Sequence, residues 1–212
     1  MPPDPAQFQH FTQAKYLYKW TGSGGKLGVF DKASRRPIRG RTHRNSCGAR
    51  NWQSAEWEKA FHFVESKVSQ ITGLNAEVSG SDADLLTGWL ALHHVRTPRN
   101  REALAKGYDV EVKRFQHWLS GCGAFVQIFD GRCLMTSDSP VCVLDSQDEH
   151  GPLDFVIAPL SPNKAIYITP NDRLPGLKTS RAPLFNPETL NQIIAHHAWK
   201  EIVSFDNRLH LP

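Results

Sequence analysis

The sequence predicts an α+β fold in which a largely antiparallel β-sheet packs against a cluster of α-helices. Three observations lead to this prediction. Helical periodicity dominates residues 54–119, short apolar runs typical of strands occupy residues 124–169, and a separate capped helix begins near residue 186. Elements in this order are typical of α+β proteins, and the chain contains no internal repeat.

Length and composition indicate one folded unit. The chain has 212 residues, 40% of them apolar, which is enough for a sizeable core. We expect a flexible, Pro-rich tail at residues 1–7. The remainder, residues 8–212, is predicted to be a single α+β domain with a helical insertion at about 54–119.

The same features bear on the location of the protein. No apolar run approaches the roughly 20 residues that span a bilayer, and the first residues lack the apolar core of a signal peptide. We therefore expect no membrane partner. The four cysteines have no C-x-x-C spacing, which predicts thiols in a reducing compartment and hence a cytoplasmic location.

The first elements are predicted to form a β-hairpin with a Gly-rich loop. Aromatic residues alternate loosely over residues 8–20, a Gly and Ser cluster follows at residues 21–25, and residues 26–31 are an apolar strand. The cluster lacks the spacing of a phosphate-binding loop, so we interpret it as a turn.

Three helices follow. The first begins after Ser54, a good cap, and repeats apolar residues at spacings of four and three as far as residue 71. The second, residues 82–95, is apolar nearly all round and is expected to be the central buried helix, ending before Pro98. The third covers about residues 100–119.

The C-terminal half is predicted to be mainly strands. Residues 124–129 and 132–135 are expected to pair through a tight turn at Asp130-Gly131, and further strands are expected at 141–144, 155–158 and 165–169. A last helix begins at Asn186, Pro187 and Glu188, a cap followed by residues that suit a first turn, and should carry apolar residues inward as far as Val203.

A Ser-Asp-x-Pro element, Ser137 to Pro140, lies between two of these apolar stretches, residues 124–129 and 141–144. Proline cannot donate to a β-ladder, and Asp is depleted from strands. The chain therefore breaks its sheet and places a carboxylate and a hydroxyl at a fixed corner. A functional site and a turn capped by Asp both have this pattern.

Basic residues are concentrated in one stretch. The formal net charge is +4, and residues 35–50 are rich in Arg with almost no acidic residue. Guanidinium groups match phosphate oxygens, so we predict that Arg36, Arg39 and Arg41 bind a nucleic-acid or nucleotide substrate. The alternative is a solvated basic loop.

Several segments occur in an order that is similar to a known family. They are an aromatic opening around Gln9-His10 and Tyr16-Leu17, two glutamates a heptad apart (Glu58 and Glu65), Arg96-x-Pro-x-x-Arg101, Ser137-Asp138-Ser139-Pro140, Pro159-Leu160-Ser161-Pro162, and a terminal helix led by Asn186. Across residues 8–208 the chain thereby resembles the bacterial and archaeal family catalogued as domain of unknown function 4238. It departs from the family pattern at Gln13-Ala14, His93 and Ser139. The resemblance implies no established activity.

The polar residues of these motifs are the candidate site. Glu58, His62 and Glu65 lie on one helical face, where carboxylates share a divalent metal readily. We predict Glu58, Glu65 and Asp138 as ligands of magnesium or manganese, the alternative being a solvated helix face.

Other residues receive roles in substrate binding and proton transfer. Arg96 ends an apolar helix and needs a partner, for which Asp138 or Glu65 would serve; exposed in a cleft, it would instead clamp a phosphate. His10 suits proton shuttling, the alternative being a packed core histidine. Gln13, Arg101 and Ser137 are assigned to substrate binding.

Two hypotheses result. In the first, the protein is a phosphodiester hydrolase acting on nucleic acid or nucleotides, with a toxin or phage-defence role and with His10, Glu65, Arg96 and Asp138 as catalytic residues. In the second, it is a non-catalytic binding, immunity or regulatory protein with a protein partner, and the same polar set is structural. An open or a sealed arrangement of Glu65, Arg96 and Asp138 discriminates between them.

Overall fold

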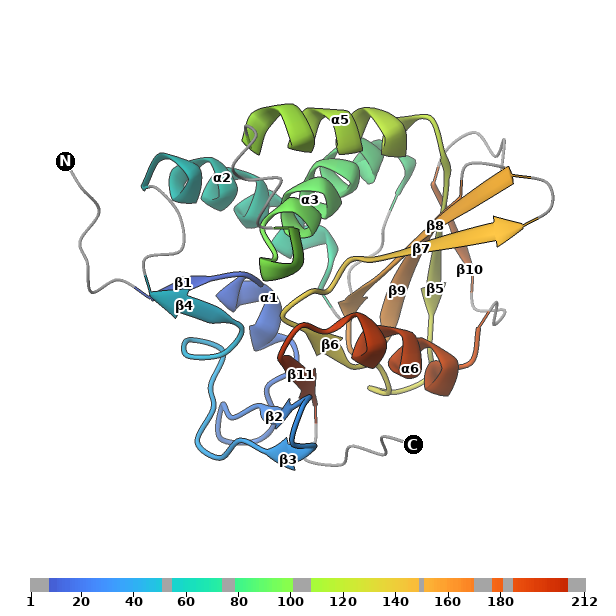
Figure 1. Cartoon of the computed structure of the whole chain (residues 1–212). Helices are drawn as coiled ribbons and strands as arrows, with labels where there is room; N and C mark the ends of the chain where they lie inside the picture. Colours follow the sequence, from blue (N-terminus) through green and yellow to red (C-terminus); the bar gives the residue numbers. More distant parts are fainter. Residues whose placement is uncertain are drawn as a thin grey trace.

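The computed structural model describes residues 8–50, 55–73, 79–100, 108–148, 151–169, 177–180 and 185–205. The tail predicted at residues 1–7 lies outside these residues. The helices are α1 (Ala14–Tyr18), α2 (Ala55–Ile71), α3 (Ala83–Val95), α5 (Tyr108–Ser120) and α6 (Pro187–His197), with short 3-10 turns at Gly80–Asp82 and Pro98–Asn100. The fold is α+β, as predicted (Figure 1).

A five-stranded sheet is the centre of the molecule. Its order is β10-β5-β9-β8-β7, and neighbouring strands are antiparallel except for β10, which runs parallel to β5. The strands are β5 (Gly123–Ile128), β7 (Cys142–Asp148), β8 (Gly151–Ser161), β9 (Lys164–Thr169) and β10 (Leu177–Ser180).

Alternate residues of these strands face different helices. Val156 and Ile166 join a buried cluster with residues of α1, α2 and α3, whereas Ile157 and Tyr167 join a second cluster with residues of α6. Because successive side chains of a strand point to opposite faces, the sheet lies between two helical layers. Figure 1 shows α2, α3 and α5 together at the top of the molecule and α6 below.

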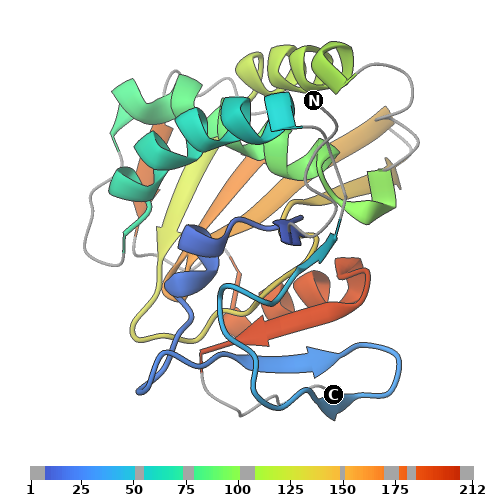
Figure 2. The ribbon, with the colours of Figure 1, turned by 90° about the vertical axis from the view of Figure 1, so that its left-hand side faces the viewer.

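Two smaller sheets complete the fold. One has the order β3-β2-β11-β6 and consists of β2 (Gly28–Asp31), β3 (Arg36–Pro37), β6 (Thr136–Ser137) and β11 (Glu201–Ser204). The other pairs β1 (Phe8–His10) with β4 (Gly48–Arg50). Figure 2 shows β2 and β11 side by side in the lower part of the molecule, joining the N-terminal segment to the end of the chain.

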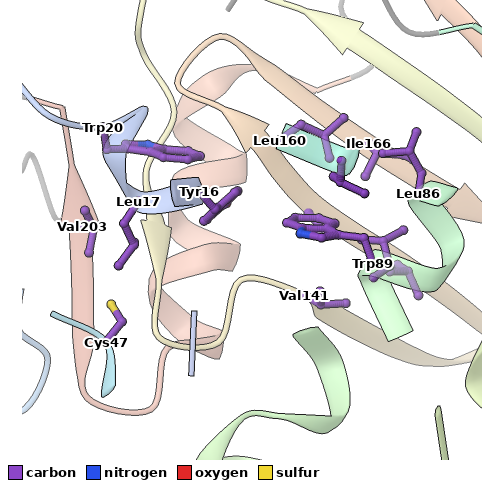
Figure 3. Packing of buried hydrophobic residues seen from close by; sticks show 14 of the residues in the cluster. Tyr16, Leu17, Trp20, Cys47, Leu86, Trp89, Val141, Leu160, Ile166 and Val203 are labelled. Carbon is purple, nitrogen blue, oxygen red and sulfur yellow. The ribbon is translucent and has the colours of Figure 1, made fainter. Parts of the chain in front are cut away.

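Aromatic residues fill the largest core cluster. The Tyr16 ring lies between those of Trp20 and Trp89 of α3, with centroid distances of 4.6 and 5.3 Å (Figure 3). The hydroxyl of Tyr16 donates to the carbonyl oxygen of Pro159 at 2.6 Å, and the indole N–H of Trp20 donates to the carbonyl oxygen of Leu134 at 2.8 Å. Helix α1 is therefore fixed to the sheets by hydrogen bonds as well as by burial.

The predicted N-terminal hairpin is wrong. Residues 14–18 form α1, and the turn around Gly24 and Gly25, which both have positive φ, leads into β2. Both edges of β2 are taken, one by β11 and the other by β3, so no edge is left for residues 8–20.

The predicted hairpin at Asp130-Gly131 is also wrong. Residues 133–135 are not a strand, because β5 already pairs with β9 on one edge and with β10 on the other. The N–H groups of Leu134 and Met135 instead donate to the carbonyl oxygen of Pro162 and to the side chain of Asn191, both at 2.8 Å.

The last helix begins as predicted but ends earlier. The side chain of Asn186 accepts from the N–H of Thr189 at 2.7 Å, and Pro187 is the first helical residue. The helix ends at His197, and Ile202 and Val203 belong to β11 rather than to the helix. Among the described residues, no helix is long and apolar enough to cross a membrane.

The β1–β4 pair has no room for a side chain at Gly48. A Cβ atom there would lie 2.4 Å from the carbonyl oxygen of Gln9 and 2.6 Å from the ring of Phe8. We expect Gly48→Ala to lower the unfolding free energy by about 1–3 kcal/mol, as overpacking does, in chemical denaturation. The matched control is Gly88→Ala in α3, where the nearest atom is 3.6 Å away and Ala should stabilise by about 0.5–1 kcal/mol. Equal effects of the two substitutions would contradict this prediction.

Candidate functional site

The Asp138 carboxylate binds the backbone of a turn that follows α6. Its Oδ1 accepts from the N–H of Trp199 at 2.9 Å, and its Oδ2 accepts from the N–H groups of Lys200 and Glu201 at 2.8 and 2.9 Å. The side chain is 1% exposed. The Ser-Asp-x-Pro element is thus a buried corner that joins β6 to the connection between α6 and β11.

Burial and hydrogen bonding act on this carboxyl group in opposite directions. Burial raises the pKa of Asp138 to about 6, although the three N–H donors favour the ionised form. Because this pKa lies above the ordinary value of 3.8, the stability that Asp138 contributes falls as the pH rises from about 4 to about 6.

Ser137 is equally enclosed. Its hydroxyl oxygen accepts from the N–H of Ser139 at 3.1 Å, and its carbonyl oxygen accepts from the hydroxyl of Thr12 at 3.0 Å. The side chain of Ser137 has no exposed surface. The hydroxyl that was assigned to substrate binding therefore stabilises a turn in this structure.

Arg96 and Glu65 form a buried ion pair. The Nη1 atom of Arg96 lies 2.8 Å from Oε1 of Glu65, and the two residues are 3% and 7% exposed. The guanidinium carbon also lies 4.6 Å from the centroid of the Phe61 ring. Of the two partners expected for Arg96, the structure shows Glu65, and the pair ties α2 to the end of α3.

The polar residues that were predicted on one face of α2 have different environments. Glu65 is buried, whereas His62 is exposed. The side chain of Glu58 and the whole of Arg101 lie outside the described residues. Among the side chains that are described, no three His, Cys, Asp or Glu residues are grouped as a metal site. The set of Glu58, Glu65 and Asp138 stays a prediction.

The two N-terminal candidates lie at the end of β1 and directly before α1. The Nε2 atom of His10 is 3.1 Å from the carbonyl oxygen of His43, and the His10 ring meets Phe8 edge-on. Gln13 is buried and precedes α1, where its carbonyl oxygen accepts from the N–H of Leu17 at 2.9 Å. The catalytic role of His10 and the substrate role of Gln13 stay predictions.

A second buried acid, Glu201, binds part of the basic stretch at residues 35–50. Arg36 and Arg39 are exposed, while Nη2 of Arg41 lies 2.9 Å from Oε1 of Glu201. The other oxygen of Glu201 accepts from the N–H of Cys47 at 2.7 Å. Arg41 thus has an internal partner, and Arg36 and Arg39 remain the exposed members of the predicted trio.

A basic pocket lies beside α1, and the sequence did not indicate it. Its volume is about 500 Å³. The described residues that line it include no carboxylate; they are Ala14, Lys15, Tyr18, Lys19, His43, Arg44, Ser69 and Gly73. Lys15 and Lys19 are four residues apart and therefore share a face of the helix, a signal that depends on assigning residues 14–18 to a helix.

The deepest cation of this basic pocket is Lys19. Its Nζ donates to the carbonyl oxygen of Leu160 at 3.0 Å and to the hydroxyl of Thr72. Burial and the nearby charge of Lys164 lower the pKa of Lys19 to about 7. Burial and the charges of Arg96 and Lys19 likewise lower the pKa of His93. The interior beside the pocket is therefore electropositive.

Further basic surface adjoins the pocket along the chain. Arg39 and Arg41 line a second pocket of about 430 Å³, together with Lys26, and residues 43 and 44 line the basic pocket. A bridge between Lys26 and Thr42 holds this segment against the start of β2.

The comparisons with known proteins give no relative. No protein-family model matches the chain, no curated protein matches it, and no solved structure matches it. The likeness to domain of unknown function 4238 stays a resemblance.

The buried ion pair predicts a non-additive mutant cycle. Arg96→Met and Glu65→Leu should each cost about 3–5 kcal/mol, because each leaves a buried charge without its partner. The double variant should cost clearly less than the sum, measured as unfolding free energy in denaturant. Lys113→Met on the exposed part of α5 is the control and should have little effect. Additive single effects would contradict the pairing.

Asp138→Asn tests the anchoring of the turn after α6. An amide presents only one acceptor oxygen, so it leaves at least one buried N–H of the turn without a partner and sets its own N–H₂ group against it. We expect a loss of about 2–5 kcal/mol, because each orphaned buried donor costs about 1–3 kcal/mol. Asp130→Asn at an exposed turn is the matched control. A wild-type melting curve for Asp138→Asn would contradict the structural role.

Proposed function

We propose that this protein binds single-stranded nucleic acid through the basic pocket beside α1. One observation carries the proposal: among the described residues, the pocket lining combines Lys15, Lys19 and Arg44 with an exposed tyrosine and contains no carboxylate. Cations that follow a phosphate backbone and an aromatic ring on which a base stacks are the two components of single-strand binding.

Tyr18 supplies the aromatic component. It is 60% exposed, one of the large hydrophobic side chains that the fold leaves in solvent, and its ring meets His43 edge-on at 5.2 Å. This exposure leaves ring surface of Tyr18 open to a base. Stacking on such a ring is worth about 1–3 kcal/mol per base and tolerates any sequence.

The exposed cations at the rim of the basic pocket, Lys15 and Arg44, are also available to contact phosphates. The side chains of Lys15 and Arg44 are exposed and have no ion-pair partner among the described residues. Arg36 and Arg39 extend the exposed charge along the adjoining segment. Surface cations without acidic partners release condensed counterions when they contact phosphates, which favours binding.

The buried polar set supports binding rather than hydrolysis. Glu65, Arg96 and Asp138 are sealed, and each is engaged by other groups of the protein. A catalytic group must come within hydrogen-bond reach of its substrate, and the burial of these three side chains disfavours such contact. The proposal therefore follows the non-catalytic hypothesis and keeps the predicted nucleic-acid partner.

A cytoplasmic location fits this proposal. All four cysteines lie in the described part of the chain, and none of them forms a disulfide. Proteins of reducing compartments have this property.

The test is a binding titration with labelled single-stranded DNA, single-stranded RNA and duplex DNA over a range of salt concentrations. We expect the single strands to bind more tightly than the duplex. Lys15→Ala/Arg44→Ala should weaken binding and make the slope of log K against log salt less steep by about 1.4, since two counterion contacts are lost. Tyr18→Ala should raise Kd about 5-fold or more through lost stacking.

The control is Lys113→Ala/Arg114→Ala, which removes the same charge from the exposed surface of α5. It should leave affinity and salt slope close to those of the wild type. The same samples are also incubated with magnesium, with manganese and with a chelator, and any cleavage of the nucleic acid is measured. This tests the hydrolase hypothesis. Identical losses in the two double variants would overturn the proposed site, and cleavage would restore the hydrolase hypothesis.

A further inference from the structure

We propose that the basic pocket holds the terminal phosphate monoester of a single strand, so that the protein recognises a phosphorylated chain end. This inference rests on the proposed function and names the part of the nucleic acid that enters the pocket.

Among the described residues, buried groups lie behind Lys19 at the inner end of the pocket. Lys19 reaches inward to Thr72 and Leu160, which are 1% and 0% exposed, and behind them Nζ of the buried Lys164 donates to the carbonyl oxygen of Gly73 at 2.7 Å. An internal phosphodiester carries a nucleotide on both sides, which keeps it at the opening of a pocket. A terminal phosphate has only one neighbour and can enter a pocket that ends in the core.

Lys19 has one N–H donor available for a ligand in the pocket. An ammonium group has three N–H donors, and two of them are used by Thr72 and Leu160. The third has no hydrogen-bond acceptor among the described residues; the ring of Tyr16 lies 5.4 Å from Nζ. A phosphate oxygen would accept this bond, and Lys15 and Arg44 at the rim would contact the remaining oxygens.

The charge of the surroundings favours a dianion. Within the described part of the chain, the titratable and charged groups that face Lys19 from the packed elements are the basic side chains of Lys164, His93, Lys15, His43 and Arg44 and the neutral hydroxyl of Tyr16. A phosphate monoester carries about −1.5 to −2 charges at pH 7, against −1 for an internal diester. Two partly or fully buried lysines therefore gain more from the terminal group.

Tyr18 lies at the mouth of the same pocket, one helical residue before Lys19. With the phosphate at Lys19, the first base of the strand would be next to the Tyr18 ring. Phosphate and stacked base together would read a chain end without reading its sequence.

Proton uptake should accompany binding. In the protein alone the pKa of Lys19 is about 7, so the ammonium loses its proton as the pH rises above 7. A bound dianion holds the proton on, so affinity for the phosphorylated end should fall by up to tenfold per pH unit above about 7. An end without phosphate lacks this dependence.

The experiment compares oligonucleotides of one sequence with a 5′-phosphate, with a 3′-phosphate or with hydroxyls at both ends, each carrying an internal fluorophore. Binding anisotropy is measured at pH 6.5, 7.5 and 8.5. We expect one phosphorylated end to bind at least tenfold more tightly than the hydroxyl form, and we expect that ratio to shrink with pH. The 5′ and 3′ arms identify which end is read.

Lys19→Met should abolish the preference for the phosphate and its pH dependence, so it should weaken binding of the phosphorylated form much more than binding of the hydroxyl form. Lys113→Met should change neither the preference nor its pH dependence. Where Lys19→Met does not fold, Lys15→Gln at the exposed rim should reduce the same preference. Equal affinity for all three oligonucleotides in the wild type would overturn this inference and leave the proposed function standing. Absence of binding to every oligonucleotide would overturn the proposed function itself.

Discussion

The hydrogen bonds of the Asp138 carboxylate are the constraint on which the rest of the structure depends. The three N–H groups that they engage belong to the turn between α6 and β11, so the corner at β6 fixes where the last helix stops and where the last strand starts. Glu201 continues this chain of contacts, because its carboxylate binds Arg41 and the N–H of Cys47. A buried acid thereby positions the basic segment on the surface.

Helix α1 is the second support of the basic pocket. It has only five residues, too few to be stable alone, and is held by the contacts of Tyr16 and by the adjoining Trp20. Its inward face is part of the main core, while its outward face carries Lys15 and Tyr18. One short element therefore connects the core packing of the aromatic residues with the chemistry of the pocket.

Much of the fold could be predicted from the sequence, because local signals agreed with the final packing. The buried helix ending before Pro98 and the cap at Asn186 are local features, and both are confirmed. The errors at residues 8–20 and 132–135 concern which strand edges are free, and that depends on partners distant in the chain, β11 and β10.

The candidate site, too, could be predicted from the sequence only in part. Polar motif residues were found because they are unusual in apolar surroundings, but the pattern of Asp138 is the same for a site and for an anchor, and the pocket required knowledge of α1.

The paired lysines beneath the pocket have a consequence for how the protein behaves in solution. Burial disfavours the charged form of Lys19 and lowers its pKa, and repulsion from Lys164 adds to this effect. Any small anion that reaches Lys19 relieves it, and a ligand that binds only the folded state shifts the unfolding equilibrium by mass action. With an anion site at Lys19 as proposed, the midpoint of thermal melting should depend on the identity of the buffer anion, and phosphate or sulfate in a storage buffer should act as a stabilising ligand rather than as an inert electrolyte.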